Sequence, residues 1–291
     1  MTPAGAADGR GLAFSGPSSP PLSEDPGTRL AAARAALGAS VTLDAEAARV
    51  SLGDGDDGEA GCALDRAMGG GLARDGLHEI APRGAPDRAS AFGFALALAA
   101  RLAAGRAILW IGDEASFAET GLPYAPGLDR HGLPSRRVIA VRARDAREAL
   151  WALEEAVKSG AAGAAVGEIG RIGSAYDLTA SRRLALAARA GGTPCLLLLS
   201  GLAGQADALS SAAMTRFEIA AAPSRRAAST GRLPLPGPPC WEVRLAKRHG
   251  GGAEGFDEIG RSFRLAWRIE TGALRDDDAA FVEPRSAASG G

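Results

Sequence analysis

The sequence AFGFALALAARLAAGRAILWI, residues 91–111, decides the fold class of this 291-residue chain. Residues 91–104 are almost entirely apolar and predict a helix. Gly105 ends this helix, because glycine readily adopts the left-handed conformation that follows a helix. Residues 107–111 form a continuous apolar run that is too short for a helix and predicts a buried strand. A buried strand that follows an apolar helix indicates a sheet covered by helices.

The same alternation of helix and strand continues toward the C-terminus. Helices are predicted at residues 145–159, with Asp145 as the N-cap and Gly160 as the stop, and at residues 179–190. Such alternation indicates βαβ units and a parallel sheet with helices on both faces. The intervening predicted strands are 138–141 (VIAV), 163–167 (GAAVG) and 195–199 (CLLLL).

Beyond residue 199 the pattern changes to strands without long helices. Residues 215–222, 240–248 and 262–270 alternate between apolar and polar side chains, which is typical of antiparallel strands with one solvated face. The expected fold is therefore α/β, with a mostly parallel sheet flanked by helices and antiparallel strands added on the C-terminal side.

Composition divides the chain into three parts. Residues 1–61 are rich in Gly, Pro, Ser and Ala and predict a mostly disordered extension with a short helix near 30–37. Residues 62–270 are expected to form one domain, and residues 271–291 a flexible tail. Residues 1–75 carry a net charge of −5, from 6 Arg and 11 acidic residues, whereas residues 76–270 carry +6, from 25 basic and 19 acidic residues.

Several features favour a soluble, cytoplasmic protein. The longest apolar runs, 91–100 and 195–199, are far shorter than the roughly 20 residues that a membrane-spanning helix needs. The N-terminus lacks the pattern of a signal peptide. The three cysteines and three histidines are scattered without the spacing of metal ligands, so no metal site and no membrane contact are predicted.

Residues 78–90, HEIAPRGAPDRAS, directly precede the predicted helix at 91–104. A P-loop ATPase would carry the motif G-x-x-x-x-G-K-[ST] at such a place, where its backbone amides hold phosphates. This segment has two prolines and a single glycine, and it lacks the lysine. It is an altered ATP site, a different site, or a plain turn between a strand and a helix.

Motifs on both sides of this segment resemble a known family. Residues 63–80, ALDRAMGGGLARDGLHEI, resemble the entry to a RecA-type ATPase core, and residues 143–168 resemble its helix and Walker B strand. The chain is more similar to ImuA, the RecA-like accessory protein of bacterial mutagenesis cassettes, than to RecA itself. The motifs for ImuA are YAPGL (124–128), RARDAREALWALEEAVKSG (142–160), LTASRRLALAA (178–188) and SAAMTRFEIAAAPS (211–224).

The resemblance covers about residues 65–270 and implies a RecA-like core with a role in the SOS response to DNA damage. It implies translesion synthesis and induced mutagenesis together with an ImuB-type, Y-family-like protein and an error-prone C-family DNA polymerase. RecA itself is a further candidate partner. Two alternatives stay open: a weak DNA-dependent ATPase of the RecA superfamily, and an SOS-induced cell-division inhibitor, against which the motifs at 124–160 argue.

The resemblance also aligns the loop with a Walker A motif. Asp87 then stands at a glycine position, Arg88 at the lysine and Ala89 at the hydroxyl that binds Mg²⁺, with Ser90 next to it. Proline has no N–H to donate, and Asp87 adds negative charge beside a polyphosphate. ATP and Mg²⁺ are therefore not expected as cofactors. The residues that remain as candidates for ATP binding are Gly84, Arg88 and Ser90.

Two acidic residues are weak catalytic candidates. In the resemblance, Glu114 takes the place of the residue that orients the attacking water, and Glu168 takes that of the Walker B acid that holds the metal. The simpler interpretation is that both are exposed residues at the ends of strands.

DNA contact has limited support in the sequence. The two loops that bind single-stranded DNA in RecA correspond to residues 169–177, with one arginine, and 200–213, with none. A solvated strand face explains the remaining basic residues as well as a contact surface does. The candidates for DNA or partner contact are Arg225, Arg226, Trp241, Arg244, Lys247 and Arg248.

Overall fold

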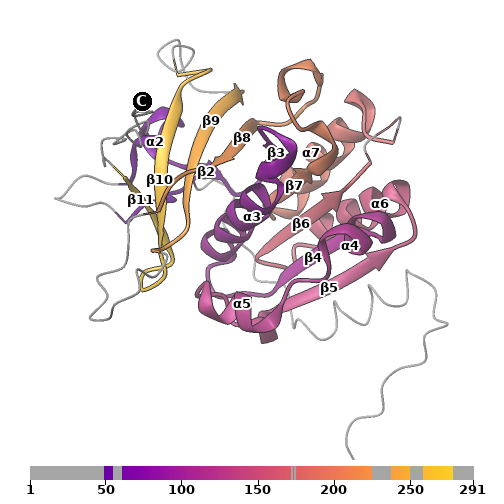
Figure 1. Cartoon of the computed structure of the whole chain (residues 1–291). Coiled ribbons are helices and arrows are strands. Elements are labelled where there is room, and N and C mark those ends of the chain that lie inside the picture. Colours follow the sequence, from indigo (N-terminus) through magenta and orange to yellow (C-terminus); the bar gives the residue numbers. More distant parts are fainter. Residues whose placement is uncertain are drawn as a thin grey trace, which may run out of the picture.

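The computed structural model describes residues 49–54, 61–171, 173, 175–224, 237–249 and 258–277. These residues form a nine-stranded sheet with the strand order β11-β10-β9-β8-β3-β7-β6-β4-β5, and a two-stranded sheet of β1 and β2 (Figure 1). The helix expected near 30–37 lies outside the described residues. The strands are β1 Arg49–Val50, β2 Leu72–Ala73, β3 Leu77–Pro82, β4 Ile108–Asp113, β5 Val138–Ala143, β6 Ala164–Ile169, β7 Cys195–Leu199, β8 Thr215–Ala221, β9 Cys240–Arg248, β10 Ser262–Arg268 and β11 Ala273–Asp276. The helices are α2 Ala63–Ala67, α3 Arg88–Ala103, α4 Glu114–Thr120, α5 Ala125–Arg130, α6 Ala146–Lys158 and α7 Leu178–Gly191.

The parallel part of the sheet runs from β8 to β5. In β7, the sequence CLLLL is buried at every position. Leu196 and Leu198 belong to the core on one face of the sheet, and Leu197 and Leu199 to the core on the other. Because alternate side chains point to opposite faces, such a strand must be apolar throughout. The expected architecture, a mostly parallel sheet flanked by helices with antiparallel strands on the C-terminal side, is confirmed.

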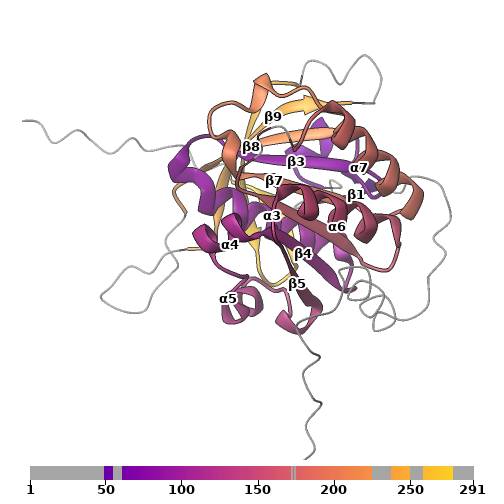
Figure 2. The same ribbon diagram turned by 90° about the vertical axis from the view of Figure 1, so that its right-hand side faces the viewer.

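Helices cover both faces of this sheet. The apolar helix α3 packs on one face, whereas α6 and α7 lie side by side on the other (Figure 2). Asp145 caps α6, since its Oδ1 accepts a hydrogen bond from Glu148 N at 2.9 Å. Helix α3 ends at Ala103, two residues before the predicted Gly105, and Ala104 between them adopts the left-handed conformation at φ 47°.

Strand β8 differs from the expectation. It is antiparallel to β9 but parallel to β3, so it belongs to both parts of the sheet. The polar positions of its alternating sequence are not solvated, because Arg216 is 3% exposed and Glu218 8% exposed. Their charges are compensated inside the protein by ion pairs with Glu79 at 2.6 Å and with Arg244 at 3.0 Å, respectively.

The ion pair between Glu79 and Arg216 is the centre of a buried network. Tyr176 donates its hydroxyl proton to Glu79, and burial raises the pKa of this tyrosine well above its usual value. Arg216 also donates to Ser211 Oγ at 2.9 Å and to the carbonyl of Ala206. The network therefore ties β3 and β8 to the loops before α7 and after β7.

Both predicted domain boundaries need correction. Strand β1 begins at Arg49 and pairs with β2, and Leu52 is fully buried, so residues 49–54 belong to the folded part and not to the extension. At the other end, β11 pairs with β10, so the tail cannot begin at residue 271. The two ends meet, since Leu274 N donates to Leu52 O at 2.8 Å.

Candidate functional site

The expected phosphate loop connects β3 to α3 through a short 3₁₀ turn, Ala85–Asp87. Its backbone amides already donate to groups of the protein. Arg83 N donates to Ile219 O at 2.8 Å, and Asp87 N donates to Gly84 O at 3.0 Å. Pro82 and Pro86 have no amide proton. A phosphate in this loop would have to compete with these bonds for its donors.

The carboxylate of Asp87 lies where it closes the loop. Its Oδ2 accepts a hydrogen bond from Gly84 N at 3.1 Å, and its Oδ1 accepts one from Ala221 N at 2.9 Å. Asp87 occupies the N-cap position of α3, but its side chain caps none of that helix's amides. An internal carboxylate thus takes up Gly84, one of the three residues expected to bind ATP.

Arg88, at the expected lysine position, begins α3 and forms an ion pair with Glu119 of α4. Both side chains are partly exposed, at 38% and 52%. Ser90 follows in the first turn of the same helix and is half-buried. The guanidinium is thereby directed at α4 and paired with a carboxylate.

Glu168, the expected Walker B acid, is fully buried near the end of β6. Its Oε1 accepts a hydrogen bond from Thr120 Oγ1 at 2.8 Å, and its Oε2 accepts one from Trp110 Nε1 at 3.1 Å. Burial raises the pKa of Glu168 above 4.5, and these two hydrogen bonds lower it by smaller amounts. The interpretation of Glu168 as an exposed loop residue is therefore wrong.

Glu114 differs from Glu168 in its surroundings. It is exposed at the first position of α4, directly after β4. Its neighbour Asp113 is 3% exposed and caps α4, since Asp113 Oδ1 accepts from Ser116 N at 2.7 Å. Of the two acids at this strand end, the buried one has a structural role and Glu114 faces solvent.

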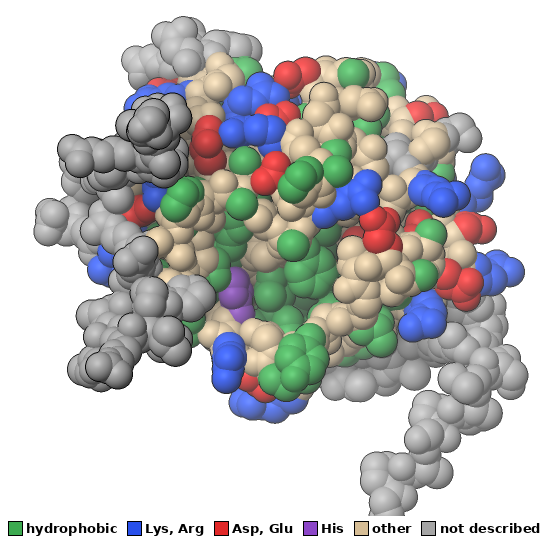
Figure 3. Space-filling view, in the orientation of Figure 1, with side chains coloured by type: hydrophobic (Ala, Val, Ile, Leu, Met, Phe, Trp, Pro, Cys, Tyr) green, Lys and Arg blue, Asp and Glu red, His purple; other side chains and the backbone are tan. Residues whose placement is uncertain are grey.

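Helix α4 is the element that joins these groups. Two consecutive residues near its end, Glu119 and Thr120, bind Arg88 and Glu168 respectively. Nothing in the sequence indicated Glu119 or Thr120, because their roles depend on where α4 lies above the sheet. Figure 3 shows a hollow between α3 and α4 in which apolar side chains gather, with Lys and Arg side chains around it.

Most of the basic side chains near β9 are already bound. Arg244 pairs with Glu218 at 3.0 Å and with Asp207 at 2.9 Å. Lys247 donates to the carbonyl of Ser211, and burial lowers the pKa of its ammonium group. Arg248 donates to Ala67 O at 2.6 Å. These three cations bind carboxylates and backbone carbonyls of neighbouring elements, so they do not form an open phosphate-binding face.

The remaining contact candidates have different outcomes. Trp241 is 2% exposed and packs edge-to-face on Phe94, with ring centroids 5.6 Å apart. Its side chain belongs to the core, which corrects the expectation of a surface contact. The sequence misled because Trp241 stands in a strand whose following residues alternate between charged and apolar, a pattern that resembles an exposed strand face. Arg225 and Arg226 lie outside the described residues.

Comparison with known proteins decides the family. Protein ImuA from Caulobacter vibrioides, in both strain NA1000 / CB15N and strain ATCC 19089 / CIP 103742 / CB 15, is 37% identical to this chain. The match covers 74% of this chain and 88% of the relative. The chain belongs to the ImuA family.

Two further comparisons accompany this result for the ImuA-family chain. The RadB recombinase structure matches it with a TM-score of 0.45 and 14% identity, over 74% of this chain and 97% of that one. No family model matches the sequence.

Among the residues that the structure describes, no helix has the length and apolarity to cross a membrane. The same residues contain no group of three or more His, Cys, Asp or Glu side chains that could hold a metal ion.

Proposed function

We propose that this ImuA-family chain is a RecA-like adaptor of the translesion-synthesis machinery that DNA damage induces, and that it acts without turning over ATP. Its partners would be an ImuB-type, Y-family-like protein and an error-prone C-family DNA polymerase, with RecA as a further partner. Membership of the ImuA family favours this mutagenesis role over that of a cell-division inhibitor.

The observation that carries the adaptor proposal is the position of α4. ATP hydrolysis needs a cation on the terminal phosphates and an acid that holds the metal. Here Arg88 is paired with Glu119, and Glu168 accepts a hydrogen bond from Thr120. ATP binding would have to break both contacts and displace the Asp87 carboxylate from Gly84 N. It would do so without the amide protons that two prolines lack.

A weak DNA-dependent ATPase is the second candidate. One observation favours it, since Glu114 is exposed at the carboxyl end of β4 and is available to orient a water molecule. In that function α4 would move away from Arg88 and Glu168 when nucleotide binds. The two candidates therefore predict opposite results for hydrolysis.

The first test is ATP hydrolysis by the purified full-length chain, with and without single-stranded DNA. We expect phosphate to be released no faster than in buffer without protein. The wild type, Glu114→Ala and Glu168→Ala should not differ in this rate. Hydrolysis by the wild type that disappears in both variants would establish the ATPase instead.

The second test is genetic. Deletion of the gene should reduce the frequency of damage-induced mutations to the uninduced level, and the Glu168→Gln variant should restore it, because no metal has to be held. An unchanged mutation frequency after deletion would remove the mutagenesis role altogether.

A further inference from the structure

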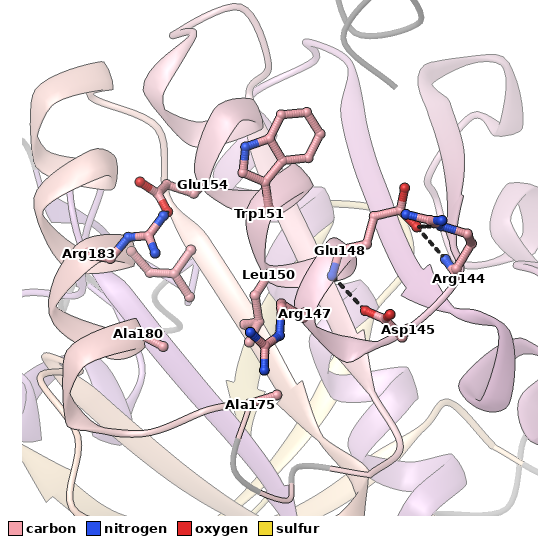
Figure 4. A pocket seen from close by; sticks show the side chains of 11 residues that line it. Arg144, Asp145, Arg147, Glu148, Leu150, Trp151, Glu154, Ala175, Ala180 and Arg183 are labelled. Carbon is pink, nitrogen blue, oxygen red and sulfur yellow. Dashed lines mark hydrogen bonds and ion pairs between the residues drawn. The ribbon is translucent and has the colours of Figure 1, made fainter. Parts of the chain in front are cut away.

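A surface groove lies between α6 and α7, on the opposite face of the sheet from α3 and away from the expected phosphate loop (Figure 4). Its volume is about 600 Å³. Apolar groups come from both helices and from the loop before α7, and charged side chains surround them. The lining residues that matter are Leu150 and Trp151 of α6, Leu184 of α7, and the arginines Arg144, Arg147 and Arg183.

Trp151 is the exposed apolar side chain of this groove. It is 39% exposed, whereas the other three tryptophans of the chain, Trp110, Trp241 and Trp267, are at most 2% exposed. A half-exposed tryptophan beside a groove is costly in water and is the residue type most enriched where protein partners bind tightly. Next to it, Leu150 and Leu184 are 7% and 1% exposed and form an apolar floor.

Two of the three arginines of the groove are paired with carboxylates. Arg144 pairs with Glu148 at 2.9 Å, and Arg183 pairs with Glu154 at 2.6 Å across the two helices. The third carboxylate of the lining, Asp145, caps α6. Within the described part of the chain, Arg147 has neither an ion pair nor a hydrogen bond from its side chain, and Figure 4 shows its guanidinium beside Ala175.

We propose that this groove binds a short segment of a partner protein that carries a large apolar side chain close to a carboxylate. The apolar side chain packs on Trp151, Leu150 and Leu184, and the carboxylate pairs with Arg147. This inference rests on the proposed adaptor function, because it names the surface and the chemistry through which the chain would hold its partner. An amphipathic segment in a groove between two helices is a recurring mode of peptide recognition.

The charge balance favours a peptide over a nucleic acid. The lining contains three arginines and three carboxylates, so its net charge is zero. Binding to a phosphate backbone depends on many uncompensated cations. One unpaired guanidinium on the same face of α6 as an exposed indole is suited to one carboxylate and one apolar group of the same short segment.

The test uses the full-length chain and the ImuB-type protein from the same organism, with the dissociation constant as the readout. Arg147→Glu and Trp151→Ala should each raise it at least tenfold. The matched control is Lys158→Glu, an exposed cation on the same helix outside the groove, which should change it less than twofold. Thermal unfolding of each variant checks that it is folded. We expect both groove variants to fold, because the side chains of Arg147 and Trp151 are exposed.

A spectroscopic readout locates the contact. With 5-fluorotryptophan in this chain alone, the ¹⁹F resonance of Trp151, assigned with Trp151→Phe, should shift when the unlabelled partner is added. The resonances of the three buried tryptophans should shift less. Exchanging the partner's contacting Asp or Glu for Arg should restore the affinity of Arg147→Glu.

Each other outcome overturns the proposal in a distinguishable way. If the wild type does not bind the ImuB-type protein, the adaptor function itself fails. If the wild type binds and both groove variants bind equally well, the groove proposal fails while the adaptor function stands. If the variants instead weaken binding of an oligo-dT strand, or dissociate a dimer in sedimentation, the occupant is DNA or a second copy.

Discussion

Arg88 at the start of α3 and Glu119 near the end of α4 form an ion pair beside the expected phosphate loop. The pair is partly exposed, and such pairs stabilise proteins by less than about 1 kcal/mol. The ion pair matters because it directs the guanidinium of Arg88 toward α4. The arginine that was expected at the lysine position of an ATPase therefore serves as a contact between two helices.

Arg88→Ala should lower the free energy of unfolding by less than about 1 kcal/mol, because only a partly exposed ion pair is lost. Damage-induced mutagenesis should remain at the wild-type level, since the proposed adaptor function requires no phosphate binding by Arg88. Urea denaturation and mutation frequency measure the two effects. A stable variant without mutagenesis would contradict this assignment of Arg88.

Glu168→Gln should become more stable relative to the wild type as the pH rises above 4.5. Burial raises the pKa of Glu168, so the folded protein holds this proton more tightly than the unfolded chain does. The wild type therefore loses stability between pH 4.5 and the raised pKa, and the glutamine variant does not. Urea denaturation from pH 4 to pH 8 measures the difference. If the stability of Glu168→Gln relative to the wild type instead fell as the pH rose, the fold would stabilise the charged form of Glu168.

Glu79→Ala should lower the free energy of unfolding by about 3–5 kcal/mol, because it leaves the buried charge of Arg216 without its partner. Removing both charges, in Glu79→Gln with Arg216→Met, should cost less than this single change. The control is Arg144→Ala, whose side chain is 81% exposed and whose ion pair lies in solvent, so that its loss should cost far less stability. Equal losses for Glu79→Ala and Arg144→Ala in urea denaturation would mean that the buried pair is not a major source of stability.

His131→Phe should reduce the loss of stability in acid. His131 stacks on Trp267, with ring centroids 5.2 Å apart, and burial lowers its pKa to about 4. The unfolded chain takes up this proton near pH 6.5, so stability falls between pH 6.5 and pH 4. Phenylalanine keeps the stacking and removes the titration. Identical pH dependence of the unfolding midpoint in both proteins would exclude His131 as a cause of acid lability.

Ala104→Gly should raise the free energy of unfolding by up to about 1 kcal/mol. Ala104 has φ 47° at the end of α3, a conformation that strains alanine but not glycine. The opposite result is expected for Ala100→Gly inside the same helix, which should lose about 1 kcal/mol. Thermal denaturation of the two variants gives the sign of each effect, and destabilisation by Ala104→Gly would mean that the strain is negligible.

The sequence predicted elements well wherever a local signal set their limits. Helix α6 begins directly after its cap Asp145, and β7 consists of the five residues of the run CLLLL. It failed where distant partners changed the meaning of a pattern. The alternation around Arg216 and Glu218 resembled a solvated strand, yet Glu79 and Arg244 neutralise both charges within the fold.

The sequence predicted where the loop between β3 and α3 lies, but not which contacts its side chains make. Asp87 could be recognised from the sequence as an obstacle to phosphate, whereas its bonds to Gly84 N and Ala221 N depend on β8 lying next to the loop. The contacts of Glu119 and Thr120 arise because α4 folds back over the sheet. No spacing in a linear sequence specifies that placement.

The contact between Leu52 and Leu274 has a consequence for the order of folding. On the ribosome, residue 52 emerges more than two hundred residues before its partner strand is made. Strands β4, β5 and β6 can pair soon after they appear, because they are neighbours both along the chain and in the sheet. The hydrogen bond from Leu274 N to Leu52 O, in contrast, must wait for β11. A nascent chain halted before residue 273 would therefore lack the contact by which the beginning of the domain is fastened to its end.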